Sequence, residues 1–310
     1  ASNGDRLLDV IDAEGITVFG TSARYIASLQ KAGKRPMASH DLSSLKTILS
    51  TGSPLVQESY DYVYREVKAD VCLASISGGT DIISCFVLGH PALPVHRGEI
   101  QSKGLGMAVE IWTEEGNSVT GEKGELVCTL PFPSCPIGFW NDLNREKYQS
   151  AYFNRFDKVW AQGDYGEITV NDGVIIHGRS DAVLNPGGVR IGTAEIYRQV
   201  EKVEGVIDSI VVGQQWQCDV RVVLFVVLRD GWQLDNSLTQ AIKSSVRRNT
   251  TPRHVPEIIL QVMDIPRTIS GKIVELAVRQ IIHGETVKNT DALANPEALL
   301  QFRDLPALKS

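Results

Sequence analysis

The sequence contains few of the residues that build metal and disulfide sites. Its 310 residues include five cysteines and six histidines, with no C-x-x-C and no H-x-x-x-H spacing. A zinc site therefore has little support. An odd number of cysteines indicates free thiols, which we expect to be buried, in a reducing cytosol. These cysteines are Cys72, Cys85, Cys128, Cys135 and Cys218.

Long apolar runs and an excess of positive charge are also missing. The longest apolar run, VVLFVVL at 222–228, is far too short to span a bilayer and is typical of a buried strand. The net charge of −6 argues against a nucleic-acid or anionic-membrane partner. The opening residues lack the basic and apolar segments of a secretory signal. We expect a cytosolic protein that binds neither nucleic acid nor membrane.

The pattern of elements predicts two domains, as the length of 310 residues also suggests. Residues 5–70 alternate helical stretches with short apolar strands, which favours a mostly parallel sheet covered by helices. Short alternating strands and turn signals dominate residues 93–180, which we expect to form a small antiparallel barrel. We assign 1–92 and 93–180 to one large domain that ends at Ser180.

Residues 181–310 have the pattern of a small, compact α+β domain. We expect helices at 193–202, 238–248 and 272–282, and strands at 206–215, 220–228 and 257–263. The predicted fold class is thus α/β combined with α+β.

Two Gly-containing loops follow strands of the first region. STGSP (50–54) exposes backbone that can lie against a flat ring, although a simple β-to-α turn also explains it. In SISGGTD (75–81), adjacent glycines allow the backbone to approach a ligand closely. There Thr80 can donate to a phosphate oxygen and Asp81 can help to hold Mg²⁺. A turn with a helix N-cap at Thr80 or Asp81 is the alternative.

Two further loops carry single charged residues. AQGDYGE (161–167) places Asp164 after a glycine at a strand start, where a carboxylate can accept both hydroxyls of a ribose. An Asp in a hairpin turn is the alternative. PRTISGKIVEL (266–276) places Lys272 at the start of a helix, where the dipole favours anions. A bound anion would resolve that conflict, and a solvated surface lysine is the alternative.

The stretch GRSDAVLNPGGVRIGTAEIY (178–197) joins the two predicted domains. It sets charges in fixed register around a segment too rich in Gly, Pro and Asn for regular structure. We interpret it as a hinge, because a few flexible backbone positions can absorb a domain rotation.

Together and in this order, these motifs resemble the adenylate-forming acyl-CoA synthetase superfamily from about Asp41 onward. Longer strings, including TILSTGSPL, SISGGTDIISCF, GELVCT and RHVPEIIL, resemble the branch of that superfamily that joins acetoacetate to coenzyme A. The resemblance implies an ATP-dependent ligase with Mg²⁺, which forms an acyl-adenylate and then transfers the acyl group to coenzyme A. Its partners would be small molecules, namely acetoacetate, ATP and coenzyme A.

The resemblance also implies roles for residues of the first domain. Gly52, Ser53 and Pro54 fall where the family lines its adenine pocket. Thr80 falls on the α-phosphate contact and Asp81 on the Mg²⁺ ligand, which is usually Glu. Ser77, Gly78 and Gly79 fall where acetate enzymes carry bulky aromatic residues, so glycines leave room for a longer acid.

Further roles concern the predicted ribose clamp, hinge and second domain. Asp164 and Arg179 match the pair that binds the ribose hydroxyls, and Asp181 matches the hinge residue. Arg190 matches the arginine that steadies the rotated domain, and Gly188 lies where the pantetheine arm of coenzyme A enters. Arg247 aligns with a cation near the nucleotide end of coenzyme A. Lys272 matches the catalytic lysine of the first half-reaction.

The family's Ser-, Thr- and Gly-rich phosphate loop is not recognisable between Ala1 and Ser50, and the sequence begins at Ala1 without a methionine. We therefore expect roughly the C-terminal half of the enzyme, which raises the question of whether this part is active alone. Two alternatives stay open. One is a ligase for another short-chain acid, and the other is a truncated, non-catalytic module that binds nucleotide, coenzyme A or a protein.

Overall fold

The chain divides after Ile176 into two units, Ala1–Ile176 and His177–Ser310. The computed structural model describes residues 5–269, 271–287 and 290–309. The predicted domain boundary, between Ser180 and Asp181, lies a few residues beyond this division.

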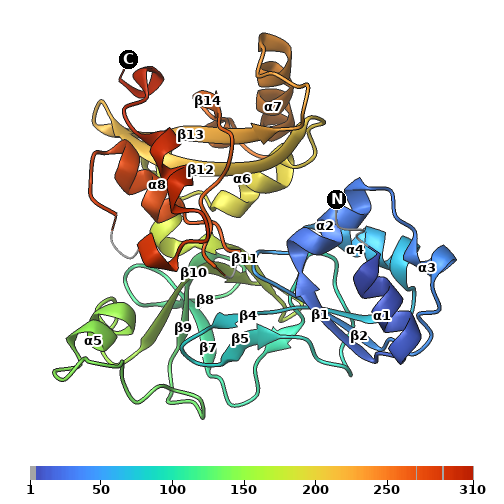
Figure 1. Cartoon of the computed structure of the whole chain (residues 1–310). Coiled ribbons are helices and arrows are strands. Elements are labelled where there is room, and N and C mark those ends of the chain that lie inside the picture. The colour runs from blue at the N-terminus through green and yellow to red at the C-terminus, as the bar shows by residue number, and fades with distance from the viewer. Residues whose placement is uncertain (1–4, 270, 288–289, 310) are drawn as a thin grey trace. The chain divides into compact units, whose positions relative to one another are not determined.

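A parallel sheet with the order β1-β2-β3 organises the first part of unit 1 (Figure 1). Apolar residues of the surrounding helices, among them Leu8, Ile11, Ile26 and Leu29, form one core with Ile48 and Leu73 of the sheet. The prediction of a parallel sheet covered by helices is therefore confirmed. The strands are β1 (Val18–Ser22), β2 (Thr47–Thr51) and β3 (Cys72–Ser75), and the helices are α1 (Arg6–Glu14), α2 (Ala23–Lys31), α3 (Pro36–Ser39) and α4 (Gln57–Tyr62), the last continued by the π-helical η1 (Val63–Val67).

Two antiparallel sheets follow, and their residues up to Ile176 belong to unit 1. One has the order β4-β5-β6 and the other β11-β10-β9-β7-β8. Their strands are β4 (Ser77–Gly79), β5 (Ser84–Leu88), β6 (Ser102–Lys103), β7 (Val109–Trp112), β8 (Ser118–Val119), β9 (Lys123–Cys128), β10 (Trp160–Ile168) and β11 (Val174–Arg179), with α5 (Glu146–Tyr152) before β10.

Antiparallel structure was expected here, but the expected barrel is wrong. In the described part of the chain the larger sheet is open, with β8 and β11 at its two edges. The physical reason is strand length and pairing. Strand β8 has two residues and pairs with β7, while the equally short β6 pairs with β5 in the other sheet, so neither supplies the ladder that closure needs.

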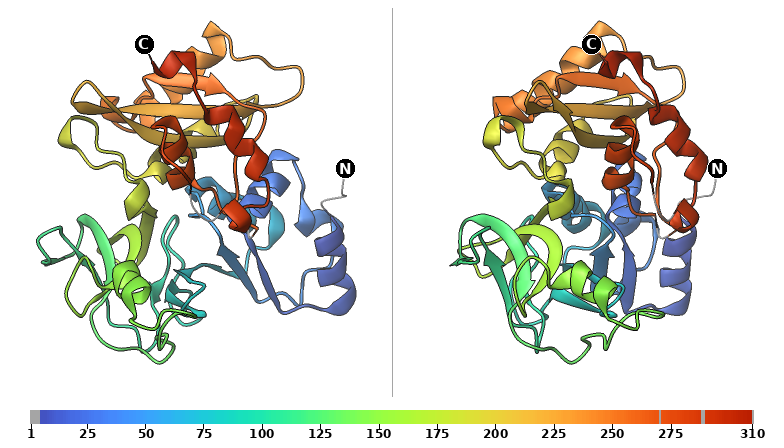
Figure 2. Two further views of the ribbon diagram at one scale, coloured as in Figure 1. Left: turned by 60° about the vertical axis from the view of Figure 1, so that its left-hand side comes forward. Right: turned by 90° about the vertical axis from the view of Figure 1, so that its left-hand side faces the viewer.

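Unit 2 is built on the sheet β12-β13-β14, in which β12 and β13 are antiparallel and β13 and β14 parallel. Both faces of this sheet are covered (Figures 1 and 2). Helices α6 and α7 pack on one face with Val211, Val222 and Leu224, and α8 packs with η6 on the other against Val223 and Phe225. The elements are η2 (Ser180–Ala182), η3 (Pro186–Gly188), α6 (Thr193–Val200), β12 (Val206–Trp216), β13 (Asp219–Leu228), α7 (Asn236–Asn249), η4 (Pro252–His254), β14 (Ile258–Gln261), α8 (Glu275–Ile282), η5 (Thr290–Ala292), η6 (Pro296–Phe302) and η7 (Pro306–Leu308).

The last predicted helix begins later than expected. It starts at Glu275, whereas the sequence predicted a start at Lys272. The backbone of Lys272 instead accepts the N–H of Thr268 at 2.9 Å, and Ile273 forms an antiparallel bridge with Arg267. The β-branched Ile273 and Val274 favour this extended conformation over a helical turn.

The expectation of buried thiols is wrong for Cys218. All five cysteines are free, but Cys218 is exposed because it lies in the turn between β12 and β13, whereas Cys128 is buried and the other three are intermediate. Burial raises the pKa of the Cys72, Cys85 and Cys128 thiols. Among the described residues, no helix has the length and hydropathy that a bilayer-spanning segment requires.

Candidate active site

The expected adenine loop leaves the carboxyl end of β2, at one edge of the parallel sheet. Gly52 and Ser53 are exposed and Pro54 is half-buried, and Gly52 has a φ of 87°. The neighbouring strand β3 ends in register with β2, and the N–H of Ile76 donates to the carbonyl of Ser50 at 2.9 Å. The segments that follow β2 and β3 therefore start from the same edge, where ligands bind in parallel sheets.

The Ser77–Gly79 segment is strand β4 of a tight hairpin. A Cβ atom at Gly78 would lie 2.0 Å from the carbonyl oxygen of Ser84, so backbone packing in the hairpin itself requires glycine there. At Gly79 a Cβ atom would meet the side-chain nitrogen of Gln162 at 3.2 Å, a contact that a movable side chain can relieve. Backbone packing thus requires glycine at position 78, whereas at position 79 a small shift of Gln162 would make room for a side chain.

Thr80 and Asp81 lie in the exposed turn of this hairpin, and strand β5 follows them. The alternative of a helix N-cap is therefore wrong. The carboxylate of Asp81 accepts a hydrogen bond from the hydroxyl of Tyr152, at the end of α5. The ring of Tyr152 is in turn stacked on Trp160, with 3.6 Å between centroids. Tyr152 was missed from the sequence, because α5 and this turn are far apart along the chain.

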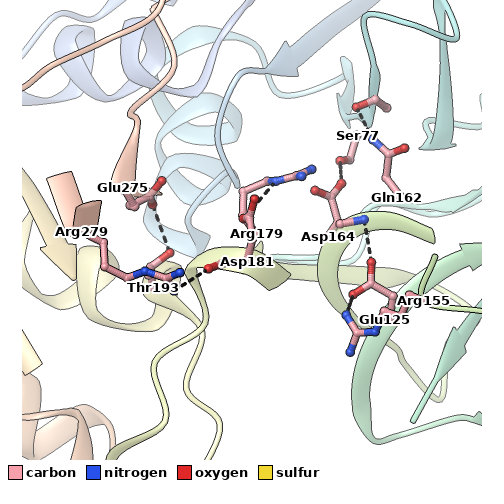
Figure 3. Close-up of polar contacts among 12 residues, drawn as sticks. Ser77, Glu125, Arg155, Gln162, Asp164, Arg179, Asp181, Thr193, Glu275 and Arg279 are labelled. Atoms are coloured by element: carbon pink, nitrogen blue, oxygen red, sulfur yellow. Dashed lines mark hydrogen bonds and ion pairs between the residues drawn. The ribbon is translucent and has the colours of Figure 1, made fainter. Parts of the chain in front are cut away.

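Asp164 lies inside β10 and not at its start or in a hairpin turn. Gln162, Gly163 and Asp164 stand where the partner strand β9 has the single residue Leu126, so β10 carries a pronounced bulge. Asp164 is 7% exposed, and one of its carboxylate oxygens accepts the hydroxyl of Ser77 at 3.1 Å. Gln162 donates to the carbonyl of Gly78 at 3.3 Å, so both side chains of the bulge point toward β4 (Figure 3).

A buried acid holds this bulge from the other strand. The carboxylate of Glu125, in β9, accepts the N–H of Gly163 at 2.6 Å and forms an ion pair with Arg155. Its side chain is 1% exposed. The sequence reading did not select Glu125, although a charged residue within the otherwise apolar run ELVC of a buried strand is a signal, because an unpaired buried charge is costly.

In unit 2, the expected ribose-binding arginine lies beside the expected hinge residue. Arg179 Nε is 3.6 Å from a carboxylate oxygen of Asp181, and both side chains are about half exposed, at 47% and 49%. The backbone carbonyl of Asp181 accepts a hydrogen bond from Arg279 of α8 at 3.2 Å (Figure 3). Asp164 belongs to unit 1 and Arg179 to unit 2.

The turn that contains Gly188 is held at several points. Leu184 and Ile191 exchange two backbone hydrogen bonds of 2.9 and 2.8 Å and close the loop that also contains the half-buried Arg190. The N–H of Gly187 donates to the carboxylate of Asp219, with contacts of 2.9 and 3.1 Å. This hydrogen bond lowers the pKa of Asp219, as does the N–H of Val220.

The carbonyl of Gly187 accepts a hydrogen bond from Arg253 at 3.2 Å. Asp219 and Arg253 were missed because they are distant in sequence from the turn. Arg247, by contrast, was selected from the sequence. It is exposed in the last turn of α7, where a cation also suits the helix dipole.

Lys272 is exposed, and its carbonyl accepts the backbone N–H of Thr268 at 2.9 Å. The Thr268 hydroxyl accepts the backbone N–H of Lys272 at 3.0 Å. Arg267 donates to the carbonyl of Gly271 at 2.8 Å and forms a 2.6 Å ion pair with Asp208 of β12. Through Arg267, the backbone next to Lys272 is therefore tied to the sheet of unit 2.

The first turn of α8 carries the half-buried acid Glu275. Glu275 accepts hydrogen bonds from the hydroxyls of Tyr197 at 3.1 Å and Thr193 at 3.3 Å, which fix α8 to α6 (Figure 3 shows the Thr193 contact). Burial is the main cause that raises the pKa of Glu275. Burial also raises the pKa of Tyr197 well above its usual value, followed by the charge of Glu275.

Metal binding by protein groups alone has little basis in the described parts of the chain, where no three His, Cys, Asp or Glu side chains converge. Asp81 offers a single exposed carboxylate. This fits Mg²⁺, which is commonly held by one or two carboxylates together with substrate phosphates and water.

Comparison with known proteins finds similar proteins along almost the whole chain. Residues 196–272 match the AMP-binding enzyme C-terminal domain. The chain is 59% identical over 308 residues to acetoacetyl-coenzyme A synthetase of Rhizobium meliloti (strain 1021), which covers 99% of this chain and 47% of that protein. It is 49% identical to acetoacetyl-CoA synthetase of Xenopus tropicalis, over 98% of this chain and 46% of that protein.

A solved structure gives the same relationship. Acetoacetyl-CoA synthetase from Streptomyces lividans aligns with a TM-score of 0.92 and 38% identity, over 100% of this chain and 48% of the solved one. The chain spans about half the length of each of these relatives. Over almost its whole length the chain is thus similar to part of these acetoacetyl-CoA synthetases.

Proposed function

We propose that this chain acts as part of an ATP-dependent acetoacetate–CoA ligase that works in the cytosol. The observation that carries the proposal is 59% identity over 99% of the chain to a protein named for that activity. The products would be acetoacetyl-CoA, AMP and diphosphate.

The reaction has two steps, each of which exchanges one bond for another. In the first, a carboxylate oxygen of acetoacetate forms a bond to the α-phosphorus of ATP, and the bond from that phosphorus to diphosphate breaks. In the second, the sulfur of coenzyme A forms a bond to the acyl carbon, the bond to AMP breaks, and the thiol proton is released. Positioning and charge neutralisation dominate such phosphoryl chemistry.

The residues of unit 1 have groups suited to the nucleotide. The Asp164 carboxylate can accept hydrogen bonds from ribose hydroxyls, and its contact with Ser77 fixes its direction. The loop of Gly52, Ser53 and Pro54 would lie against the adenine ring. Thr80 would donate to the α-phosphate, and Asp81 would share Mg²⁺ with the phosphates. The bound ion would supply positive charge to the oxygens of the departing diphosphate.

The residues of unit 2 would serve the two steps in turn. Lys272 would neutralise negative charge during adenylate formation. Arg179 would bind the ribose, and rotation at Asp181 would bring Gly188 toward the pantetheine arm of coenzyme A. Arg190 would steady the rotated domain. Arg247 would contact its nucleotide end. The hydrogen bonds of Gly187 to Asp219 and Arg253 support this assignment, because they hold the glycine turn in one conformation.

The resemblance assigns Ser77, Gly78 and Gly79 of β4 to the acyl pocket, where the lack of bulky side chains would suit an acid longer than acetate. Gly78 also has a packing reason, because a Cβ atom there would lie 2.0 Å from the carbonyl oxygen of Ser84. Small residues do not by themselves select a keto group.

Activity of the full-length natural protein tests the proposal. With ATP, Mg²⁺ and coenzyme A, acetoacetate should give AMP, diphosphate and acetoacetyl-CoA with a higher kcat/KM than acetate or butyrate. A preference for either of the other acids would reassign the substrate. No acid-dependent release of diphosphate would contradict a ligase and favour a non-catalytic module.

A further inference from the structure

We propose that Glu125 and Arg155 are positioning residues that set the Asp164 carboxylate for the hydroxyls of the nucleotide ribose. The inference rests on the proposed function, because it assumes that Asp164 binds that ribose. It adds two residues to which the sequence motifs assigned no role.

The need for such residues comes from the bulge itself. Three residues of β10, from Gln162 to Asp164, stand opposite the single residue Leu126 of β9. A bulge redirects side chains, but it leaves ladder groups without their usual partners. Gly163 has a φ of 78°, a region that side chains disfavour, which explains a glycine at this position.

Glu125 replaces the missing ladder partner. Its carboxylate accepts the Gly163 N–H at 2.6 Å, directly next to Asp164 in the chain. The main chain before Asp164 is thus fixed from β9, while its side chain is fixed by Ser77 from β4. These two contacts, from two different sheets, determine where the Asp164 carboxylate lies (Figure 3).

Arg155 makes the buried acid tolerable. The Glu125 side chain is 1% exposed, and the Arg155 guanidinium, 33% exposed, forms the ion pair with it. Arg155 also lies over the ring of Phe156, 5.6 Å from its centroid, which restricts the guanidinium. A buried carboxylate without its partner would be costly, so loss of Arg155 should loosen the Glu125 contact with Gly163.

The test separates positioning from general stability by asking whether the enzyme still reads the ribose hydroxyls. It compares ATP with 2′-deoxy-ATP and 3′-deoxy-ATP as substrates of the full-length protein, in acetoacetate-dependent diphosphate release. A hydroxyl bound by a carboxylate should be worth about tenfold or more in kcat/KM. We expect wild type to show that loss for at least one analogue.

Glu125→Leu should abolish this discrimination. Its kcat/KM for ATP should fall by about tenfold or more, close to the wild-type value for the deoxy analogue, while KM for acetoacetate changes less than twofold. Glu125→Gln should recover part of the discrimination, because an amide oxygen still accepts the Gly163 N–H. Arg155→Met should lose discrimination, and Glu125→Gln/Arg155→Met should regain some of it, because the double variant has no unpaired buried charge.

Glu66→Leu is the matched control, because Glu66 also pairs with arginines, Arg35 and Arg65, but belongs to η1 beside the parallel sheet. It should discriminate as wild type does. Urea unfolding identifies any variant that fails to fold, and Glu125→Gln then carries the test.

The outcomes separate the inference from the proposed function. A folded Glu125→Leu or Glu125→Gln protein with the full wild-type preference for ATP over both deoxy analogues would overturn the positioning role and leave the ligase intact. A wild-type protein that accepts all three nucleotides equally would also overturn the positioning role, because Asp164 would then not bind the ribose hydroxyls. No activity in wild type would instead contradict the proposed function.

Discussion

The hydroxyl of Ser77 donates to the carboxylate of Asp164 at 3.1 Å, across 87 positions of the chain. Ser77 belongs to a strand of one antiparallel sheet and Asp164 to the bulged strand of another. The sequence assigned Ser77 to the acyl pocket and Asp164 to the ribose. Their contact joins the two assignments and makes Ser77 part of the proposed nucleotide site.

We therefore expect Ser77→Ala to weaken the use of ATP by the enzyme. Loss of a hydrogen bond to a charged acceptor should raise KM for ATP about three- to tenfold in the full-length protein. KM for acetoacetate should change little, because alanine enlarges the pocket only slightly. Steady-state kinetics with each substrate varied in turn provide the measurement. A rise confined to acetoacetate would show that Ser77 lines only the acyl pocket.

Lys272→Ala should separate the two half-reactions. The exposed Lys272 ammonium group would neutralise charge only while the adenylate forms, so that step should slow by about a hundredfold or more. Thioester formation from supplied acetoacetyl-adenylate should stay within about twofold, since Lys272 would then be away from the reacting atoms. Lys243→Ala, a lysine on α7, is the control. Equal losses in both steps would contradict the role of Lys272.

Asp181→Pro should affect the half-reactions unequally. Asp181 is the middle residue of the short 3₁₀ turn η2, and proline fixes φ while it excludes Ser180 from the helical region. The pivot would then be held in one conformation, and one half-reaction should fall about tenfold or more relative to the other. Asp181→Ala, which keeps normal backbone freedom, is the comparison. If the ratio of the two half-reaction rates were the same in Asp181→Pro as in wild type, the hinge would lie elsewhere.

Local patterns predicted much of the fold, because they depend on neighbours in sequence. The apolar run at 222–228 is buried strand β13, and the alternation of helices and strands before residue 76 is the parallel sheet. The Asp164 bulge could not be found this way. Gly163 was visible, but the group that holds it, Glu125, lies 38 positions earlier on another strand.

The start of α8 was mispredicted for a similar reason. Ser270, Gly271 and Lys272 precede a helical pattern, so local propensity favoured a helix from Lys272. The bridge between Arg267 and Ile273 prevails, and it is tied to β12 through Asp208. Tertiary contacts of this kind decide element boundaries that propensity leaves open.

Glu275 should make stability depend on pH. Burial raises its pKa in the folded state above the ordinary value of 4.5. The folded protein therefore binds this proton more tightly, and the resulting contribution to the free energy of unfolding is full below pH 4.5 and lost as pH rises through the raised pKa. Glu275→Gln keeps an acceptor for Thr193 and Tyr197 without the charge. Its stability relative to wild type should increase with pH across that window.

Urea unfolding midpoints of both proteins at several pH values between about 4 and 8 measure this difference. Glu204→Gln, which changes an exposed acid of the same unit, provides the control and should show no such trend. A constant difference between wild type and Glu275→Gln at all pH values would contradict the raised pKa.

Cys218→Gly should stabilise unit 2. Gln217 and Cys218 form the two-residue turn between β12 and β13, next to the pair Trp216–Asp219, and have φ values of 45° and 67°. Turns with both residues at positive φ favour Asn-Gly, because other side chains are strained there. Glycine at 218 should remove that strain and increase the free energy of unfolding by about 1 kcal/mol, after the greater entropy of the unfolded glycine is included. Gln217→Asn should increase the free energy of unfolding by a smaller amount.

The control is Ala294→Gly, at an exposed position of unit 2 without a positive φ, which should instead lower the urea midpoint. If Cys218→Gly lowered the midpoint as Ala294→Gly does, the turn would not be the strained element that its backbone angles indicate.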